Sequence, residues 1–119
     1  MLLIILLIFL DLLTKYLFKG IKNYGASFGI LQGYAAFLII AGLIVIIICF
    51  YYYFKDKNLR IPLSFVIAGA LGNLVDRIFL GYVRDFIDLK FFPVFNLADS
   101  FNFIGVCLLI YLNIKKSNS

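Results

Sequence analysis

The sequence predicts an all-α membrane protein with four transmembrane helices, on the basis of its composition and of four long apolar stretches. Hydrophobic residues make up 65% of the 119 residues and charged residues only 14%, too few to cover a water-facing surface. About 20 apolar residues cross the hydrocarbon core of a bilayer. Residues 2–18, 34–54, 61–80 and 100–114 approach or reach this length, within one predicted domain of residues 1–119. Backbone groups inside lipid must be hydrogen-bonded within their own segment, so we expect each stretch to be a helix.

The four stretches differ in the polar residues that they carry. The first contains Asp11 and Lys15, whose i, i+4 spacing favours an ion pair on one helical face, with Lys15 extending towards the membrane surface. The second has no charged residue. The third carries Asn73 and Asp76 at i, i+3, which places them on a common face, and the adjacent Arg77 could pair with an aspartate. The fourth begins close to Asp99.

Basic residues suggest how the chain is oriented in the membrane. The net charge is +5, from eleven basic residues against six aspartates, and residues 55–60 carry three of the basic residues in one short loop. The positive-inside rule therefore places this loop and both termini in the cytoplasm, with residues 19–33 and 81–99 outside. We interpret the basic excess as a signal for topology and for anionic lipid headgroups, and not as a nucleic-acid interface.

Several kinds of active site are excluded by residues that the chain lacks. It contains no histidine, which excludes Ser-His-Asp and Cys-His catalysis and makes a zinc site improbable. Cys49 and Cys107 lie within apolar runs, and we expect both to be small buried residues without a disulfide.

Polar residues gather towards the predicted outer ends of the helices, where they would form one patch. Thirteen residues separate Asp85 from Asp99, and the chain must return to the same membrane face between them, so their carboxyl groups can meet. Two carboxyl groups in a poorly hydrated place share a proton, and one can then act as a base while the other acts as an acid. The sequence could therefore build an aspartic peptidase. The patch comprises Asp11, Asn73, Asp76, Arg77, Asp85, Asp88, Asn96 and Asp99.

Simpler interpretations of these residues stay open. Asp99 could be the N-cap of the fourth helix. Asp85 and Asp88 could be solvated loop residues, and the polar residues of the third helix could only hold the bundle together. A small transporter would also carry intramembrane charges, although a conduction path should be polar along its whole length. An assembly subunit would lose no reaction when Asp85 and Asp99 are replaced by Asn.

Five motifs, in order along nearly the whole chain, resemble those of lipoprotein signal peptidase, also called signal peptidase II. They are Asp11-Leu-Leu-Thr14-Lys15, Asn23-Tyr-Gly25-Ala-Ser-Phe28-Gly29, Gly69-Ala-Leu-Gly72-Asn73-Leu-Val-Asp76-Arg77, Gly81-Tyr-Val83-Arg-Asp85-Phe86 and Phe95-Asn96-Leu-Ala98-Asp99-Ser100.

The resemblance implies an aspartic endopeptidase of the bacterial cytoplasmic membrane that is monomeric and contacts membrane lipids. It would remove signal peptides from prolipoproteins, cutting before a diacylglyceryl-modified cysteine at the outer face. It also implies a small extracytoplasmic β-structure from residues 19–33 and part of 81–99, and no need for a metal or organic cofactor. By position, the catalytic residues would be Asp85 and Asp99. Asn23, Gly25, Asn73, Asp76, Arg77 and Asn96 would shape the site or bind substrate, and Asp11 and Lys15 would support it. The sequence departs from the family pattern at Lys22, Ser27 and Arg84 and in a short 85–99 segment.

Overall fold

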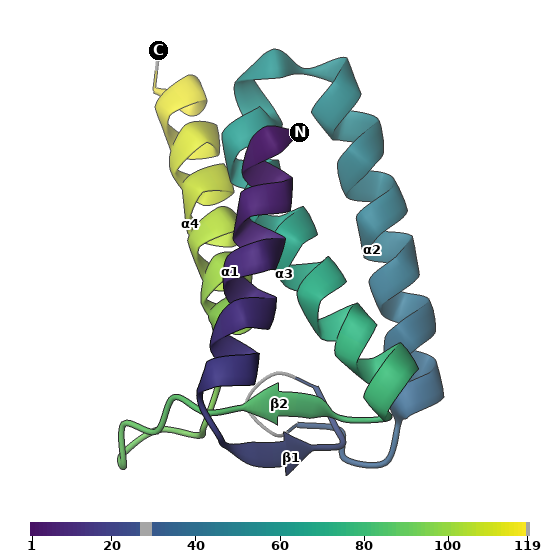
Figure 1. Cartoon of the computed structure of the whole chain (residues 1–119). Helices are drawn as coiled ribbons and strands as arrows, with labels where there is room; N and C mark the ends of the chain where they lie inside the picture. Colours follow the sequence, from purple (N-terminus) through teal and green to yellow (C-terminus); the bar gives the residue numbers. More distant parts are fainter. Residues whose placement is uncertain (27–29, 119) are drawn as a thin grey trace.

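The computed structural model describes residues 1–26 and 30–118, which form a helical bundle with a two-stranded sheet at one end (Figure 1). Both termini lie at the opposite end of the bundle, together with the turn between α2 and α3 (Figure 1). The elements, in order, are α1 (Leu2–Leu17), β1 (Ile21–Asn23), α2 (Ala35–Lys55), the short 3-10 helix η2 (Lys57–Leu59), α3 (Arg60–Leu80), β2 (Val83–Asp85) and α4 (Leu97–Ser117).

Helix α3 is the centre of the bundle and packs against α1, α2 and α4. Ile67 and Ala68 of this helix are completely buried. By contrast, α2 buries only Ile46, Cys49 and Tyr53, because it contacts one side of the bundle. Most of the apolar surface of α2 is therefore left facing outward, as expected for a helix that lies in lipid.

Cys49 and Cys107 have different environments, although both lie in apolar runs. Cys49 packs in the core with Tyr53 and Ile67, which confirms the prediction for this residue. The prediction of a buried side chain is wrong for Cys107, which is exposed. Both thiols are free.

Three of the described helices are long and apolar enough to cross a membrane: Ala35–Lys55, Lys57–Leu80 and Leu97–Ser117. Helix α1 has 16 residues, or about 24 Å at 1.5 Å per residue, against a hydrocarbon core of about 30 Å. The mostly helical membrane fold is thus confirmed, and the crossing by α1 stays a prediction.

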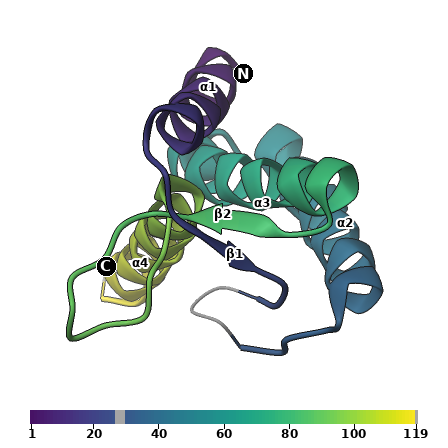
Figure 2. The ribbon, with the colours of Figure 1, turned by 60° about the horizontal axis from the view of Figure 1, so that its bottom comes forward.

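The two strands form a small antiparallel sheet at the end of the bundle that is remote from the termini (Figures 1 and 2). Ile21 pairs with Asp85 and Asn23 with Val83. The chain leaves α3 through Gly81, whose φ of +81° lies in the left-handed region that favours glycine. Small β-structure was expected from residues 19–33 and 81–99, and the sheet confirms it.

Helix α4 begins at Leu97, three residues before the expected start at residue 100, because Asn96 caps it. The Asn96 side chain accepts a hydrogen bond from the Asp99 backbone N–H, and the Asp99 side chain accepts one from the Asn96 backbone N–H. This is a capping box. Asn96 and not Asp99 is therefore the N-cap, and the carboxylate of Asp99 lies in the first turn of α4.

Candidate active site

The two aspartates singled out by the sequence lie at the sheet end of the bundle, on separate elements. Asp85 is the last residue of β2, and Asp99 lies in the first turn of α4. Their exposed fractions are 1% and 3%. The interpretation of Asp85 as a solvated loop residue is therefore wrong, because pairing with β1 covers it. Asp88, in contrast, is exposed and pairs with Lys90 on the surface.

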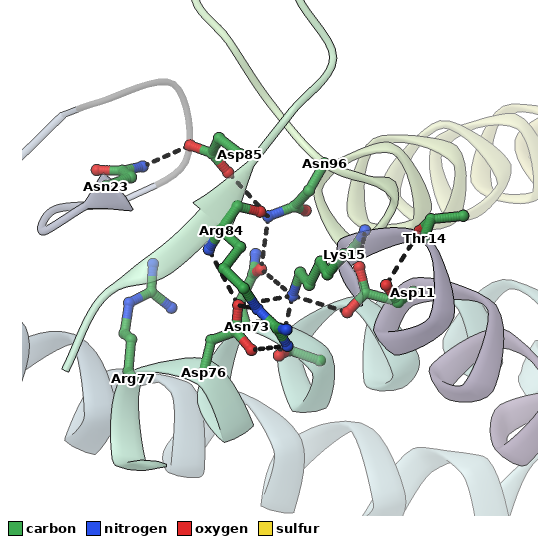
Figure 3. Close-up of polar contacts among 12 residues, drawn as sticks. Asp11, Thr14, Lys15, Asn23, Asn73, Asp76, Arg77, Arg84, Asp85 and Asn96 are labelled. Atoms are coloured by element: carbon green, nitrogen blue, oxygen red, sulfur yellow. Dashed lines mark hydrogen bonds and ion pairs between the residues drawn. The ribbon is translucent and has the colours of Figure 1, made fainter. Parts of the chain in front are cut away.

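Asp85 is held by two side-chain amides, as Figure 3 shows. The Asn23 Nδ2 donates to Asp85 Oδ2 at 3.0 Å, and the Asn96 Nδ2 donates to Asp85 Oδ1 at 2.9 Å. Burial, followed by the nearby charge of Asp99, raises the pKa of Asp85 to about 7, against the lowering effects of Asn23, Lys15 and Asn96. Near neutral pH this carboxyl group can therefore hold a proton or release it.

Asp99 is held by a second set of N–H donors, to which Asn96 also contributes. The Asn73 Nδ2 donates to Asp99 Oδ1 at 2.9 Å, and the Asn96 backbone N–H donates to Asp99 Oδ2 at 3.2 Å. Asn96 is completely buried and also donates to Asn73 Oδ1 at 3.0 Å. Asn96 thus contacts both candidate carboxyl groups, Asp85 through its side chain and Asp99 through its backbone N–H.

A buried lysine joins α1 to the polar face of α3 (Figure 3). Lys15 Nζ lies 2.8 Å from Asp11 Oδ2 and 3.3 Å from Asp76 Oδ2, and it donates to Asn73 Oδ1 at 3.2 Å. The predicted pair with Asp11 is confirmed. The expectation that Lys15 extends to the membrane surface is wrong, because these acceptors from α3 hold it inside, with 3% of the residue exposed.

Asp11 also fixes the start of α4, since its Oδ1 accepts from the Ala98 backbone N–H at 2.9 Å. Gly72 makes this arrangement possible, because a Cβ at this position would collide with the Asp11 carboxylate. The close approach at Gly72 is thus between α3 and a side chain of α1. The network that connects Lys15 to Asn73 therefore extends to the helix that carries Asp99.

The family of this chain follows from its similarity to known proteins. Residues 3–115 match the sequence profile of the family described as Signal peptidase (SPase) II. The chain belongs to the signal peptidase II family. Members are aspartic proteases that remove signal peptides from prolipoproteins, so the chain is a membrane peptidase, as its motifs predicted.

Relatives and solved structures agree with this assignment. The lipoprotein signal peptidase of Caldanaerobacter subterraneus is 39% identical, over 92% of this chain and 91% of the relative. That of Caldicellulosiruptor bescii is 48% identical, over 81% of this chain and 65% of the relative. A solved structure described as a bacterial membrane enzyme superposes with a TM-score of 0.88 at 35% identity, covering 98% of this chain and 87% of that one.

Arg77 has a different partner from the aspartate that the sequence suggested. Its Nη2 donates to the backbone oxygen of Gly25 at 3.1 Å. The Gly25 backbone N–H in turn donates to Asn23 Oδ1 at 2.9 Å. Arg77 and Gly25 therefore hold the turn that follows Asn23, beside the candidate dyad. Residues 27–29 of the same motif, among them Ser27, lie outside the described residues.

Two members of the site could not be found from motifs. Arg84 donates to Asp76 through its backbone N–H at 3.0 Å and through Nη2 at 2.9 Å, and it replaces Arg77 as the partner of this aspartate. Gln32 Nε2 donates to Asn23 Oδ1 at 2.7 Å. The only sign of this role in the sequence was the alternation of side chains along β2, which turns the Arg84 side chain to the face opposite Asp85.

Proposed function

We propose that Asp85 and Asp99 form the catalytic dyad of this peptidase and that it cuts prolipoproteins before a diacylglyceryl-modified cysteine. The observation that carries the proposal is the pair of buried carboxyl groups joined through Asn96. A lipid-modified cysteine would be anchored at the membrane surface, which is where the start of α4 would lie. The scissile bond and the two carboxyl groups would then meet at one depth.

The environment of each carboxyl group supports an assignment of roles. Asp85 carries the raised pKa of about 7 and is the group that we assign the shared proton. Asp99 accepts from a backbone N–H and lies in the first turn of α4, where the positive end of the helix dipole stabilises a negative charge. Asp85 is then the acid and Asp99 the base at the start of the reaction.

Hydrolysis then follows the general course for two carboxyl groups that share a proton. Asp99 takes a proton from water as the water oxygen bonds to the scissile carbonyl carbon. Asp85 donates its proton to the carbonyl oxygen, which gives a neutral tetrahedral diol. Asp99 next transfers its proton to the amide nitrogen, the C–N bond breaks, and one hydroxyl proton of the diol returns to Asp85. The products are a carboxylic acid and an amine, and the dyad regains its starting protonation.

The other site residues hold the dyad in this geometry. Asn23, Asn73 and Asn96 orient the carboxyl oxygens through the hydrogen bonds that end on them. Arg77 and Gly25 would shape the substrate pocket beside Asn23. The cluster of Asp11, Lys15 and Asp76 fixes α1 and α3 beneath the dyad.

We also propose the orientation of the chain, with four crossings, both termini in the cytoplasm and the sheet outside. Helix α1 would cross as well, since it runs alongside α3 and is followed by β1 at the sheet end (Figure 1). A membrane-impermeant maleimide, applied to intact cells, should label the Asp88→Cys variant and spare the Asn58→Cys variant. The reverse pattern would contradict this topology. We further propose that the protein acts as a monomer.

Cleavage of a defined substrate tests the proposed function. The purified protein in detergent should cut a diacylglyceryl-modified prolipoprotein immediately before the modified cysteine, as read by mass spectrometry, and leave the unmodified precursor intact. Asp85→Asn and Asp99→Asn should each abolish cleavage while Asp88→Asn, at an exposed aspartate of the same segment, cuts normally. Full activity of either dyad variant would refute the dyad, and equal cleavage of both substrates would refute the proposed specificity.

A further inference from the structure

A groove of about 340 Å³ runs between α2, α3 and α4, with α3 lying between the other two helices (Figure 2). Most of its lining is apolar and includes the small residues Ala41 and Gly42 of α2, with Val106 of α4. Three polar side chains also line it: Asn73, Arg77 and Asn102. Asn73 donates to Asp99, so one end of the groove reaches the candidate dyad.

Asn102 is the polar side chain of this groove for which the site offers no explanation. It lies three residues after Asp99, about one turn of α4 further along the helix, and Val106 follows on the same face. Among the residues that the structure describes, no hydrogen bond is formed by its side-chain amide. Its neighbours Phe101, Phe103 and Ile104 are apolar. An unsatisfied amide at membrane depth lowers stability, so its presence needs a reason.

The opposite helix leaves room for this amide. Gly69 of α3 faces Asn102, and a Cβ at Gly69 would collide with the Asn102 side-chain carbonyl group and with the backbone oxygen of Ala98. The Asn102 side chain is thus packed against the floor of the groove, half-buried, and lines its interior. It is positioned to meet whatever enters the groove.

A peptide substrate has a matching requirement. Near the scissile bond the substrate must be extended, because a helical carbonyl is already hydrogen-bonded to its own chain. Its freed N–H and C=O groups would then lie among apolar side chains, where each unpaired group is unfavourable. A side-chain amide offers both a donor and an acceptor and can pair with one peptide unit.

We propose that Asn102 binds the substrate backbone on the signal-peptide side of the scissile bond, within the groove between α2, α3 and α4. This side is favoured because the groove extends from the dyad along helices that cross the bilayer, where the signal peptide lies. The inference rests on the proposed function, since it takes the dyad as the point of cleavage. Asn102 is a substrate-binding residue and takes no part in proton transfer.

Activity and stability should respond to Asn102→Leu in opposite directions. We expect kcat/KM for the lipid-modified prolipoprotein to fall roughly tenfold, about the value of one hydrogen bond to an uncharged partner. Thermal stability in detergent should stay equal or rise, because an unsatisfied amide is replaced by an apolar side chain. Asn102→Ala should show the same loss of kcat/KM. Asn113→Leu, the same change on an exposed part of α4, should leave both quantities unchanged.

Synthetic lipopeptide substrates locate the contact. Each peptide N–H before the scissile bond is replaced in turn by an ester oxygen, and both proteins are assayed. At one position the ester should slow the wild type roughly tenfold and leave Asn102→Leu nearly unaffected, since that hydrogen bond is already absent.

Three outcomes would overturn the inference. One is wild-type or faster cleavage by a folded Asn102→Leu, as expected if the groove holds a lipid chain. Another is a loss of stability in both Asn102 variants that parallels the loss of activity, which would indicate a structural role. The third is equal slowing of both proteins by every ester. Asp85→Asn and Asp99→Asn, assayed in parallel, show separately whether the proposed dyad fails.

Discussion

Asp85→Asn should make the protein inactive and, above neutral pH, more stable than the wild type. The pKa of Asp85 is about 7 in the folded protein against 3.8 for a free side chain. The folded state therefore holds this proton more tightly than the unfolded state does. Any stability that comes from this proton is fully present below pH 3.8 and is lost as the pH rises through about 7. Three pKa units correspond to a loss of about 4 kcal/mol.

The variant also changes the hydrogen bonds around position 85. An asparagine side chain offers one acceptor oxygen where the carboxylate offers two to Asn23 and Asn96, so one donor loses its partner. That change lowers stability by about 1–3 kcal/mol relative to the carboxylate, but an asparagine does not titrate and so adds no pH dependence of its own. The pH dependence of the difference between the two proteins therefore isolates the buried carboxyl group.

SDS titration in mixed micelles, followed by circular dichroism, gives the free energy of unfolding. Measured at about pH 4 and about pH 8, the difference between Asp85→Asn and wild type should shift by about 4 kcal/mol in favour of the variant. Asp88→Asn, at an exposed carboxylate, should show no comparable shift. A difference that is the same at both pH values would refute the account of Asp85.

Three further changes test the surrounding network. Lys15→Met should lower the free energy of unfolding by about 3–5 kcal/mol, because it leaves Asp11 buried without its cation. Adding Asp11→Asn to this variant should recover part of the loss, as measured by the same SDS titration. Asn23→Ala removes a hydrogen bond that lowers the pKa of Asp85, so the alkaline limb of the kcat profile should move to higher pH. Gly72→Ala should destabilise the protein by about 1–3 kcal/mol, because its methyl group collides with Asp11.

Each of these changes has a control elsewhere in the chain. Lys90→Met breaks an exposed pair with Asp88 and should change stability by at most about 1 kcal/mol. Lys22→Ala, next to Asn23 in β1, should not move the alkaline limb. Gly42→Ala should be tolerated, since the nearest atom to its new Cβ is 3.9 Å away on Leu74. If a variant and its control have equal effects, the contact from which that prediction was derived does not have the role given to it.

The sequence was sufficient where a feature depends on local spacing. The pairing of Asp11 with Lys15 and the common face of Asn73 and Asp76 follow from helical periodicity, and the structure has both. Even so, spacing along one helix does not tell which way a long side chain points. Lys15 is turned inward because Asp76, 61 residues away in the chain, is there to receive it.

Features that depend on contacts between distant segments could not be predicted. The burial of Asp85 requires β1 to pair with β2 across more than 60 residues of chain. Asn96 was found from its motif, but its contact with both carboxyl groups depends on the early start of α4. A single asparagine such as Asn102 forms no pattern in an apolar run, and only the groove around it makes it noticeable.

The central claim is that two buried carboxyl groups share one proton, held on Asp85. Infrared difference spectroscopy measures it directly, through the carbonyl stretch of a protonated carboxyl group. The wild type should show a band that disappears as the pH rises through about 7. Asp85→Asn should lack this band, and Asp99→Asn should keep one, because burial still favours the neutral form of Asp85. A band that persists in Asp85→Asn and is lost in Asp99→Asn would place the proton on the other aspartate and contradict the account.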